Sequence, residues 1–384
     1  MSTNRGLFVA KTMVFCALAL FSFNHSARAL IIKPTYDITV TTNANAALIE
    51  ADVGIAITNY ESLFTNAITL NIGVYWGTNG ANNPFNDGFD IGLSESDAVL
   101  EYNPNPGVFG FVQVTNAFWA ARKTAAQISA YRHLPGSDPS PNGAIWAVPR
   151  CEAKALGIAA LVTNPNDSQN DGAIGFSSDS DIVFDFNPTN RAVAGEFDFI
   201  ACVEHELAEV MGRTTYKMDE SGYYLPFDLF RFTGNGIESI TGEDTGVYFS
   251  VDGGATDLEN YNMDGDGGDI QDWASPSSPP DSYDAFAYDG SENYLSYADL
   301  IVMNVLGYQL TYKAPKQAIQ QASANSVLLT FTNQTGMALG ILTTTNASPA
   351  TWTLMGMPTE SPIGHYQFTA ATTNNVQLYD VILQ

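Results

Sequence analysis

Three residues in one short segment have the types and the spacing that metal-assisted hydrolysis needs. Residues 205–209 read His-Glu-Leu-Ala-Glu. In a helix, residues i and i+4 lie on the same face, so His205 and Glu209 can share one metal ion. Glu206 lies beside them, where its carboxylate can take a proton from a metal-bound water molecule. The segment therefore predicts a metal site with its own general base.

The surrounding residues predict the helix that would carry this site. Over residues 198–211, apolar side chains fall on one side of a helical wheel, and the three polar residues fall on the other with Cys202. Asp198 suits the N-cap, and Gly212 suits the helix exit. The same pattern also fits an ordinary amphipathic helix with a solvated acidic face, because a motif of three fixed positions is weak by itself.

Histidine is scarce in this chain, which limits the ligands of such a site. Of the four histidines, His25 lies in the N-terminal segment and His365 lies near the C-terminus. A three-histidine site within this segment is therefore excluded, and the site must be rich in carboxylates. A cation bound by one imidazole and two carboxylates is largely neutralised, so it acidifies its water less. Such oxygen-rich sites also suit harder cations than zinc.

The overall charge favours cations and excludes nucleic acid as a partner. The chain has 384 residues and a formal net charge of −26 at pH 7. Binding to phosphate backbones needs clusters of Lys and Arg, which an acidic chain does not supply. With 45% hydrophobic and 12% aromatic residues, the chain can bury a core in one large or two ordinary domains.

Residues 1–29 are predicted to form a secretory signal peptide. Arg5 and Lys11 precede an apolar run at residues 13–23, and Ala27-Arg28-Ala29 matches the cleavage rule. An uncleaved anchor is the alternative, which the short apolar run disfavours. Removal of the segment leaves 12 basic and 41 acidic residues, a net charge of −29. We therefore expect a secreted or periplasmic protein with no membrane span after signal removal.

The order of the predicted elements favours an α+β domain at residues 30–312. We expect strands or hairpin-like segments at residues 36–41, 67–76, 145–150 and 172–186. We expect helices at residues 46–64, 116–134, 153–161, 198–211 and 297–306. Gly, Asn, Asp and Pro predict long loops at residues 77–110 and 252–294.

A change of composition marks a second unit near the C-terminus. From Lys313 onward the chain has two basic and two acidic residues. Strand-like runs follow at residues 327–332, 340–345, 351–355 and 376–383. We predict a β-sandwich-like module at residues 321–384, joined by a linker at residues 313–320. It loosely resembles short β domains of secreted bacterial proteins, which implies a spacer or attachment role.

Two further features have more than one interpretation. Asp264, Asp266 and Asp269 lie on a glycine-rich loop that could bind calcium, although Trp273 at the twelfth position rules out an EF-hand. A solvated acidic loop is the alternative. Two cysteines remain after signal removal, and they could form a disulfide or stay as two buried thiols. They are Cys151 and Cys202.

Residues 146–232 resemble a family of secreted bacterial metalloproteases that is zincin-like and close to the metzincins. The resemblance is carried by Trp146-Ala147-Val148-Pro149-Arg150, Glu152-Ala153-Lys154-Ala155-Leu156-Gly157, Asp198-Phe199-Ile200, His205-Glu206-Leu207-Ala208-Glu209-Val210-Met211-Gly212-Arg213 and Phe227-Asp228-Leu229-Phe230-Arg231-Phe232. Residues 249–254, 272–273 and 299–308 extend it. It implies a zincin-like domain with a mixed sheet and an active-site helix.

By this resemblance, His205 and Glu209 would bind the metal and Glu206 would be the general base. Many members of such families have the full H-E-x-x-H motif, whereas this chain has Glu209 at the position of the second histidine. Zinc is the expected metal, with another divalent cation as the alternative.

The third metal ligand is left open between several residues. The usual metzincin spacing would place the third ligand at Thr215, whose side chain is a poor metal ligand. The nearest carboxylates are Asp219, which we prefer, and Asp228; each also fits a turn or capping role. His133 is a more distant candidate.

We therefore expect an exported metal-dependent peptidase that acts on proteins or peptides. Metal-held water would attack the peptide carbonyl while Glu206 takes its proton, with Tyr216 or Tyr223 near the oxyanion. One alternative is a non-catalytic, metalloprotease-like secreted binding or surface protein. Another is a calcium-stabilised structural protein with a solvated acidic helix face.

Overall fold

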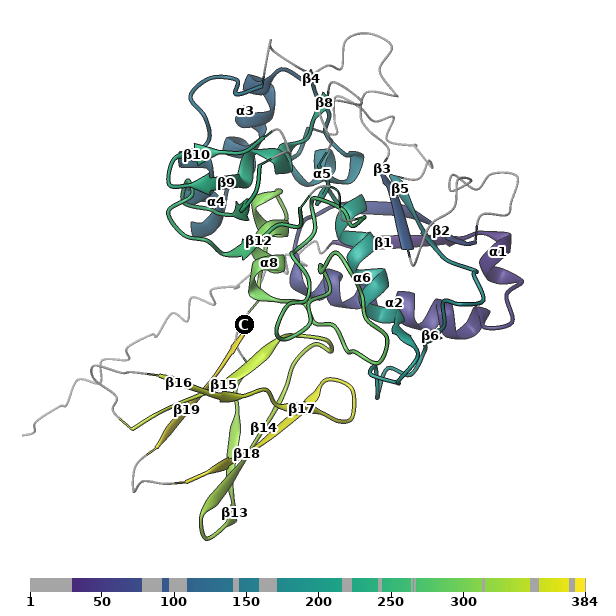
Figure 1. Ribbon diagram of the computed structural model, residues 1–384, viewed down its shortest axis with the longest axis vertical. Coiled ribbons are helices and arrows are strands. Elements are labelled where there is room, and N and C mark those ends of the chain that lie inside the picture. Colours follow the sequence, from purple (N-terminus) through teal and green to yellow (C-terminus); the bar gives the residue numbers. More distant parts are fainter. Residues whose placement is uncertain are drawn as a thin grey trace, which may run out of the picture.

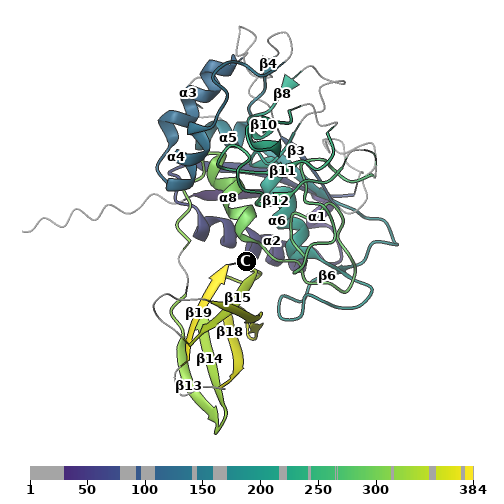
Figure 2. The ribbon, with the colours of Figure 1, turned by 60° about the vertical axis from the view of Figure 1, so that its left-hand side comes forward.

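The computed structural model describes residues 30–77, 92–96, 109–140, 145–158, 171–215, 223–240, 244–263, 265, 267–312, 315–345, 352–372 and 377–383. In these residues the fold is mixed α/β, with several sheets and seven α-helices. Figures 1 and 2 show a larger body, which carries the helices, and a smaller module of strands at one end. Among the described segments, no helix is both long and apolar enough to cross a bilayer. The predicted signal peptide, residues 1–29, lies outside them.

A four-stranded mixed sheet forms the centre of the body. Its strands, in spatial order, are β1 (Ile31–Tyr36), β2 (Thr69–Trp76), β5 (Gly172–Phe176) and β3 (Gly92–Ser96). Strands β1, β2 and β5 are parallel, and β3 runs antiparallel to β5 at the edge. Every residue of β5 is buried, as expected for an inner strand with both faces covered.

Two long helices lie against this sheet. Helices α2 (Ala46–Leu63) and α6 (Phe199–Val210) pack against each other, and α6 also contacts β3 and β5. The helix expected at residues 46–64 is confirmed, and its apolar positions Ile49, Val53 and Ile57 are buried. The other helical elements are α1 (Ile38–Thr41), α3 (Phe111–Ala121), α4 (Ala125–Arg132), α5 (Arg150–Ala155), α8 (Tyr297–Val305) and the 3₁₀ helix η3 (Pro226–Phe230).

The rest of the body is rich in loops joined by very short strands. These strands are β4 (Ile145–Trp146) with β8 (Tyr223–Tyr224), β6 (Phe184–Asp185) with β7 (Phe197–Asp198), and the sheet of β10 (Ile237–Glu238), β9 (Arg231–Gly234), β11 (Tyr248–Phe249) and β12 (Glu259–Asn260). Between residues 261 and 294 the described chain has isolated β-bridges only. Apart from the two residues of β12, the loop expected at residues 252–294 is therefore confirmed in its described part.

Several expectations about the elements are wrong. The range expected to be a long loop, residues 77–110, contains strand β3, which pairs with β5 at the edge of the central sheet. The helix expected at residues 153–161 begins earlier, at Arg150, and ends at Ala155, before Gly157 with its φ of 75°. The strand expected at residues 36–41 ends at Tyr36, because the Asp37 carboxylate accepts a hydrogen bond from the backbone of Thr39 and starts α1. The helix expected at residues 116–134 is two helices, because Thr124 forms a capping box with Gln127. Residues 172–186 are no hairpin, since β5 joins the central sheet while β6 pairs with β7.

The C-terminal module consists of two facing antiparallel sheets in its described residues. One sheet has the order β13 (Ala318–Ser323), β14 (Ser326–Thr332), β18 (His365–Ala371) and β17 (Thr359–Glu360). The other has the order β16 (Thr353–Gly356), β15 (Leu339–Thr344) and β19 (Leu378–Leu383). Strand β13 begins at Ala318, inside the range expected to be a linker.

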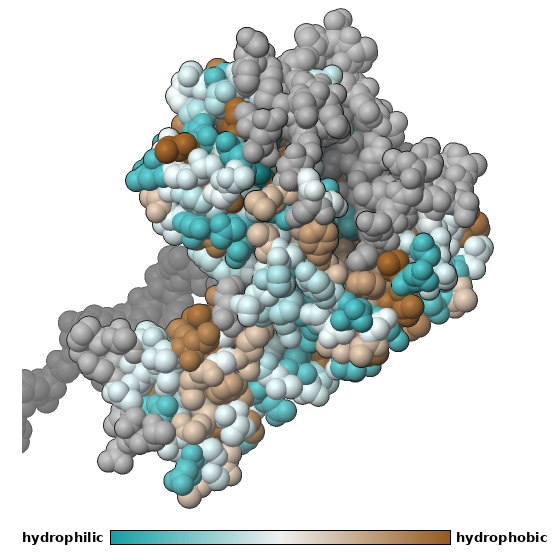
Figure 3. Space-filling view, viewed as in Figure 1, coloured by the Kyte–Doolittle hydropathy of each residue, from teal (hydrophilic) through white to brown (hydrophobic). Residues whose placement is uncertain are grey.

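The module contacts the body through the turn between β14 and β15. This turn comprises residues 333–338, and we call it the docking loop. Leu295 donates its backbone N–H to Gly336 and accepts one from Ala338, at 2.7 and 2.9 Å. Both Leu295 and Met337 are buried at this junction. In the space-filling view of Figure 3, the module and the body form one continuous surface on this face.

The exit of α6 depends on a glycine that no other residue can replace without strain. Gly212 has a φ of 122°, and a Cβ atom there would lie 3.1 Å from Glu152. We predict that Gly212→Ala lowers the free energy of unfolding by about 3 kcal/mol, from backbone strain and overpacking together. Gly157→Ala is the matched control, because Gly157 has a φ of 75° and open space around its Cβ position. It should cost about 1 kcal/mol. Urea denaturation measures both variants, and equal losses would contradict the steric argument.

Candidate metal centre

Helix α6 begins and ends as the sequence predicts. Asp198 is the N-cap, and its carboxylate accepts a hydrogen bond from the backbone of Ala201 at 3.3 Å. The helix is buried on nearly every side, including Glu204, Glu206 and Glu209, and only His205 is partly exposed. The alternative of a solvated acidic helix face is therefore wrong.

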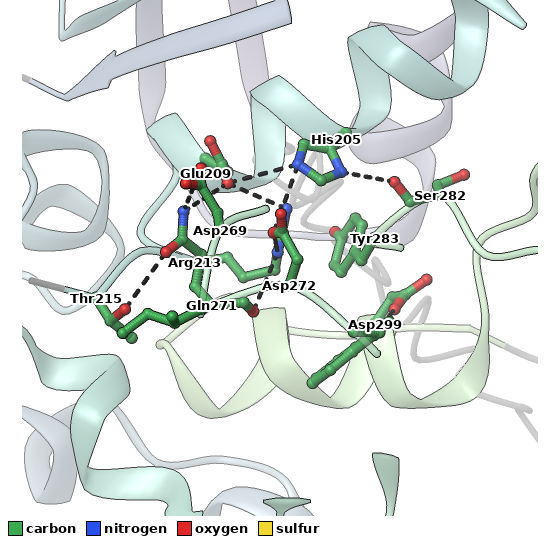
Figure 4. Close-up of polar contacts among 12 residues, drawn as sticks. His205, Glu209, Arg213, Thr215, Asp269, Gln271, Asp272, Ser282, Tyr283 and Asp299 are labelled. Carbon is green, nitrogen blue, oxygen red and sulfur yellow. Dashed lines mark hydrogen bonds and ion pairs between the residues drawn. The ribbon is translucent and has the colours of Figure 1, made fainter. Parts of the chain in front are cut away.

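A histidine and two acids converge beside this helix. His205 Nε2 lies 3.5 Å from Glu209 Oε1 and 3.5 Å from Asp272 Oδ1. In the part of the chain that the structure describes, these three residues are the group whose possible ligand atoms all lie within 4.8 Å of one another. Figure 4 shows the two carboxylates on the same side of the imidazole. The helix supplies two donors, and the loop before α8 supplies the third.

A backbone carbonyl group fixes the orientation of the His205 ring through Nδ1, the nitrogen that does not face the two acids. Its Nδ1 lies 2.8 Å from the backbone oxygen of Ser282. Because a carbonyl oxygen only accepts, Nδ1 carries the hydrogen and donates it. The other nitrogen, Nε2, is then the one that faces Glu209 and Asp272. This is the arrangement that metal-binding histidines commonly have.

The two acids are held in place by their own partners. Arg213 lies with Nη1 2.6 Å from Asp272 Oδ1 and with Nη2 3.6 Å from Glu209 Oε1. The guanidinium also lies over the Tyr283 ring, 4.1 Å from its centroid. Gln271 Nε2 donates to Glu209 Oε1 at 3.0 Å. The carboxylates are therefore oriented before any cation binds, which lowers the cost of assembling the site.

Charge pairing sets the ionisation of this cluster. Burial alone would lower the pKa of His205, but Asp272 and Glu209 raise it to about 10. Burial disfavours the ionised form of Glu209, whereas His205 and Arg213 outweigh it and lower the pKa of Glu209 to about 2. Burial raises the pKa of Asp272 to about 7, against the opposing effect of His205 and Arg213. A cation that binds Nε2 must therefore displace a proton.

Glu206 is buried next to this group and its Oε2 atom has no hydrogen-bond partner. Burial and the neighbouring Glu209 raise the pKa of Glu206 well above its ordinary range. A buried carboxylate oxygen without a partner is rare, because leaving it unpaired costs free energy. Such an atom is suited to exchange a proton with a molecule that enters the site.

The remaining candidate residues fall in other places. Asp219, Asp264, Asp266 and Tyr216 lie outside the described residues. Asp228 is buried but caps η3, where its Oδ2 accepts from the Leu225 backbone at 2.9 Å, and it is no member of the converging group.

Two other candidates lie on the surface. His133 is exposed at the end of α4, where its Nδ1 lies 2.9 Å from the Ser129 carbonyl oxygen, and Tyr223 is exposed in β8. Neither belongs to the converging group.

One predicted calcium ligand lies next to the cluster. Asp269 Oδ2 accepts a hydrogen bond from Gln271 Nε2 at 3.0 Å, and the same amide nitrogen also donates to Glu209. Asp269 is exposed, so it forms the outer edge of the site. The acidic loop is thus connected to the histidine cluster through one amide group.

Asp272 is the residue that sequence reasoning missed as a ligand. Asp272 was named only as part of the Asp272-Trp273 pair that extends the resemblance, and no spacing rule connects it to the helix. This pair was the feature of the sequence that could have pointed to Asp272, because Trp273 is completely buried and donates from Nε1 to Asp299 Oδ1 at 2.7 Å. The buried indole fixes the position of its neighbour Asp272.

The cysteines play no part in this group. Cys151 and Cys202 are both buried and do not form a disulfide with each other. Of the two possibilities left open, the structure has the buried thiols.

Comparisons with protein families, with curated proteins and with solved structures found no match to this chain. The interpretation of the site therefore rests on its residues and their geometry.

We predict that Asp272→Asn weakens the binding of a divalent cation by more than about a hundredfold, since loss of a supporting partner alone costs 10–100-fold. Asp228→Asn is a matched control, because Asp228 is also buried and burial raises its pKa to about 7. It should leave the affinity unchanged. Isothermal titration with Zn²⁺ and Mn²⁺ measures both, and a larger loss in Asp228→Asn would contradict the assignment of Asp272.

We also predict that cation affinity rises with pH. The pKa of His205 is about 10, so the imidazole is protonated at neutral pH and each bound cation releases at least one proton. Affinity should then increase about tenfold per pH unit above roughly pH 7, and more steeply below it, where Asp272 with its pKa of about 7 must also lose a proton. Titration in buffers of different ionisation enthalpy counts the released protons directly. A pH-independent affinity would show that the cation does not bind at His205.

Proposed function

We propose that this chain is an exported metal-dependent peptidase that hydrolyses peptide bonds in proteins or peptides. The observation that carries the proposal is the convergence of His205, Glu209 and Asp272, with the buried, unpaired carboxylate oxygen of Glu206 beside them. The resemblance to zincin-like secreted metalloproteases supports the choice of reaction, and the predicted signal peptide supports export.

The three converging residues fit a divalent cation. They would hold it through His205 Nε2 and one carboxylate oxygen each from Glu209 and Asp272. Three protein donors leave positions open for water and substrate, as in catalytic metal sites. One imidazole and two carboxylates suit zinc, and they also suit a harder cation such as Mn²⁺. Both ions therefore belong in the test.

The residues of the chain divide the remaining chemistry between them. A bound cation would supply an acidified water molecule and would polarise the peptide carbonyl group. Once a bound cation lowers the raised pKa of its carboxyl group, Glu206 would take the proton of the attacking water at its unpaired Oε2 and later deliver it to the leaving amine. Arg213 keeps the two acids turned toward His205 through its ion pairs. Ser282 holds the imidazole in the tautomer that presents Nε2.

One observation favours a second candidate function, a non-catalytic binding or surface protein. Arg213 already forms ion pairs with both acids of the site, Glu209 and Asp272. Together with a protonated His205, it can neutralise them without a metal ion. In that case the cluster would be a structural charge network that fixes α6 against the loop before α8.

We predict that Glu206→Gln lowers the rate of hydrolysis of an unfolded protein substrate about 10²- to 10⁴-fold while cation binding persists. Glutamine has the same shape and cannot take the proton. Glu50→Gln is the control, because Glu50 is an exposed residue of α2 outside the site. A fluorescent casein assay and metal analysis of the purified proteins measure both effects. Wild-type protein that binds the cation but is inert would favour the binding-protein function.

A further inference from the structure

The docking loop of the C-terminal module reaches the elements that carry the candidate metal centre. The backbone oxygen of Thr335 accepts a hydrogen bond from Asn59 Nδ2 at 3.2 Å, and Gln334 Nε2 donates to Ser62 Oγ at 2.7 Å. Asn59 and Ser62 both lie on α2, which packs against α6. A module that acted only as a spacer would need none of these contacts.

A continuous chain of hydrogen bonds leads from this loop to the imidazole. Asn59 Nδ2, which contacts Thr335, also donates to Glu204 Oε1 at 2.7 Å. Ser282 Oγ donates to Glu204 Oε2 at 3.3 Å. The backbone oxygen of the same Ser282 accepts from His205. Glu204 is completely buried, and both of its carboxylate oxygens are used in this chain.

A second contact joins the docking loop to the start of α6. Gly336 has a φ of 68°, and a Cβ atom there would lie 2.4 Å from Arg191 Nη1. Arg191 is buried and forms an ion pair with Asp198 through Nη2 and Oδ2, at 2.8 Å. Asp198 is the N-cap of α6. The loop backbone therefore packs directly on the arginine that fixes the first turn of the helix.

These contacts should affect cation affinity, because a metal site tolerates little misplacement of its donor atoms. Partners that orient a ligand histidine typically change metal affinity by 10–100-fold when they are removed. Glu204 and His205 are neighbours on α6, and they hold one residue, Ser282, by its hydroxyl and by its carbonyl oxygen. Any shift of Glu204 is therefore passed to the carbonyl that fixes the His205 ring.

We propose that the docking loop of the C-terminal module is part of the support of the metal centre, and that Glu204 is a positioning residue for His205. Thr335 holds Glu204 through Asn59, and Gly336 holds the N-cap through Arg191. The inference rests on the proposed function, since it assigns the support of the same site. It differs from the expectation that the module is a spacer or an attachment domain.

The first experiment displaces the docking loop. Gly336→Ala should push the loop away from Arg191 and weaken binding of Zn²⁺ or Mn²⁺ about tenfold. It should also speed hydrogen exchange of the α6 amides. Gly356→Ala is the matched control in the same module, because Gly356 also has a positive φ, 146°, but its Cβ position meets only ordinary contacts. Its cation affinity and α6 exchange should equal those of the wild type.

The second experiment removes the hydrogen bonds of Glu204 without moving the module. Glu204→Leu has a similar volume but accepts no hydrogen bond, so cation affinity should fall about tenfold. Glu204→Gln retains an oxygen that accepts from Asn59, and it should remain within about threefold of the wild type. Rescue by glutamine but not by leucine identifies positioning, because a purely steric role would be served by both. Affinities are measured well below the unfolding temperature of each variant.

The outcomes separate this proposal from the proposed function. If the wild type binds a cation and both Gly336→Ala and Glu204→Leu bind it equally well, the positioning proposal is overturned and the peptidase proposal stands. If the wild type binds no cation, the peptidase proposal fails, and the exchange of the α6 amides decides whether the loop supports the helix. Unchanged exchange in Gly336→Ala would then overturn the support role too.

Discussion

The structure depends on two buried acids that face one imidazole. Glu209 and Asp272 each lie 3.5 Å from His205 Nε2, in a region where unpaired charge is costly. Arg213 neutralises part of that charge, and the Ser282 carbonyl fixes the ring. A cation at Nε2 would complete the neutralisation and replace the imidazole proton. Helix α6 and the loop before α8 keep these groups within reach of one another.

The third donor, Asp272, lies on a loop, so no regular element fixes its position. The described part of residues 261–294 has isolated bridges in place of regular strands, so side chains must anchor it. Trp273 is buried against Asp299 at the start of α8, and Tyr283 donates to or accepts from Tyr60 of α2 at 2.7 Å. These aromatic residues tie the loop to two helices. The docking loop of the module pairs with Leu295, directly after this region, through two backbone hydrogen bonds.

The sequence predicted the local features well and the long-range ones poorly. The i, i+4 pair, the Asp198 cap and the long α2 follow from patterns within one helix, where neighbours in sequence are neighbours in space. Asp272 could not be found this way, because its approach to His205 depends on how a loop packs. The strand expected after Tyr36 failed for a local reason, since one aspartate cap redirected the chain into α1.

The most direct test of the account is crystallographic. Crystals soaked with Zn²⁺ or Mn²⁺ would be measured at the absorption edge of the metal, where anomalous scattering locates the ion. We expect one peak about 2.0–2.2 Å from His205 Nε2 and from a carboxylate oxygen of both Glu209 and Asp272. No peak there, with Arg213 still bridging the two acids, would contradict it and leave a structural ion-pair network.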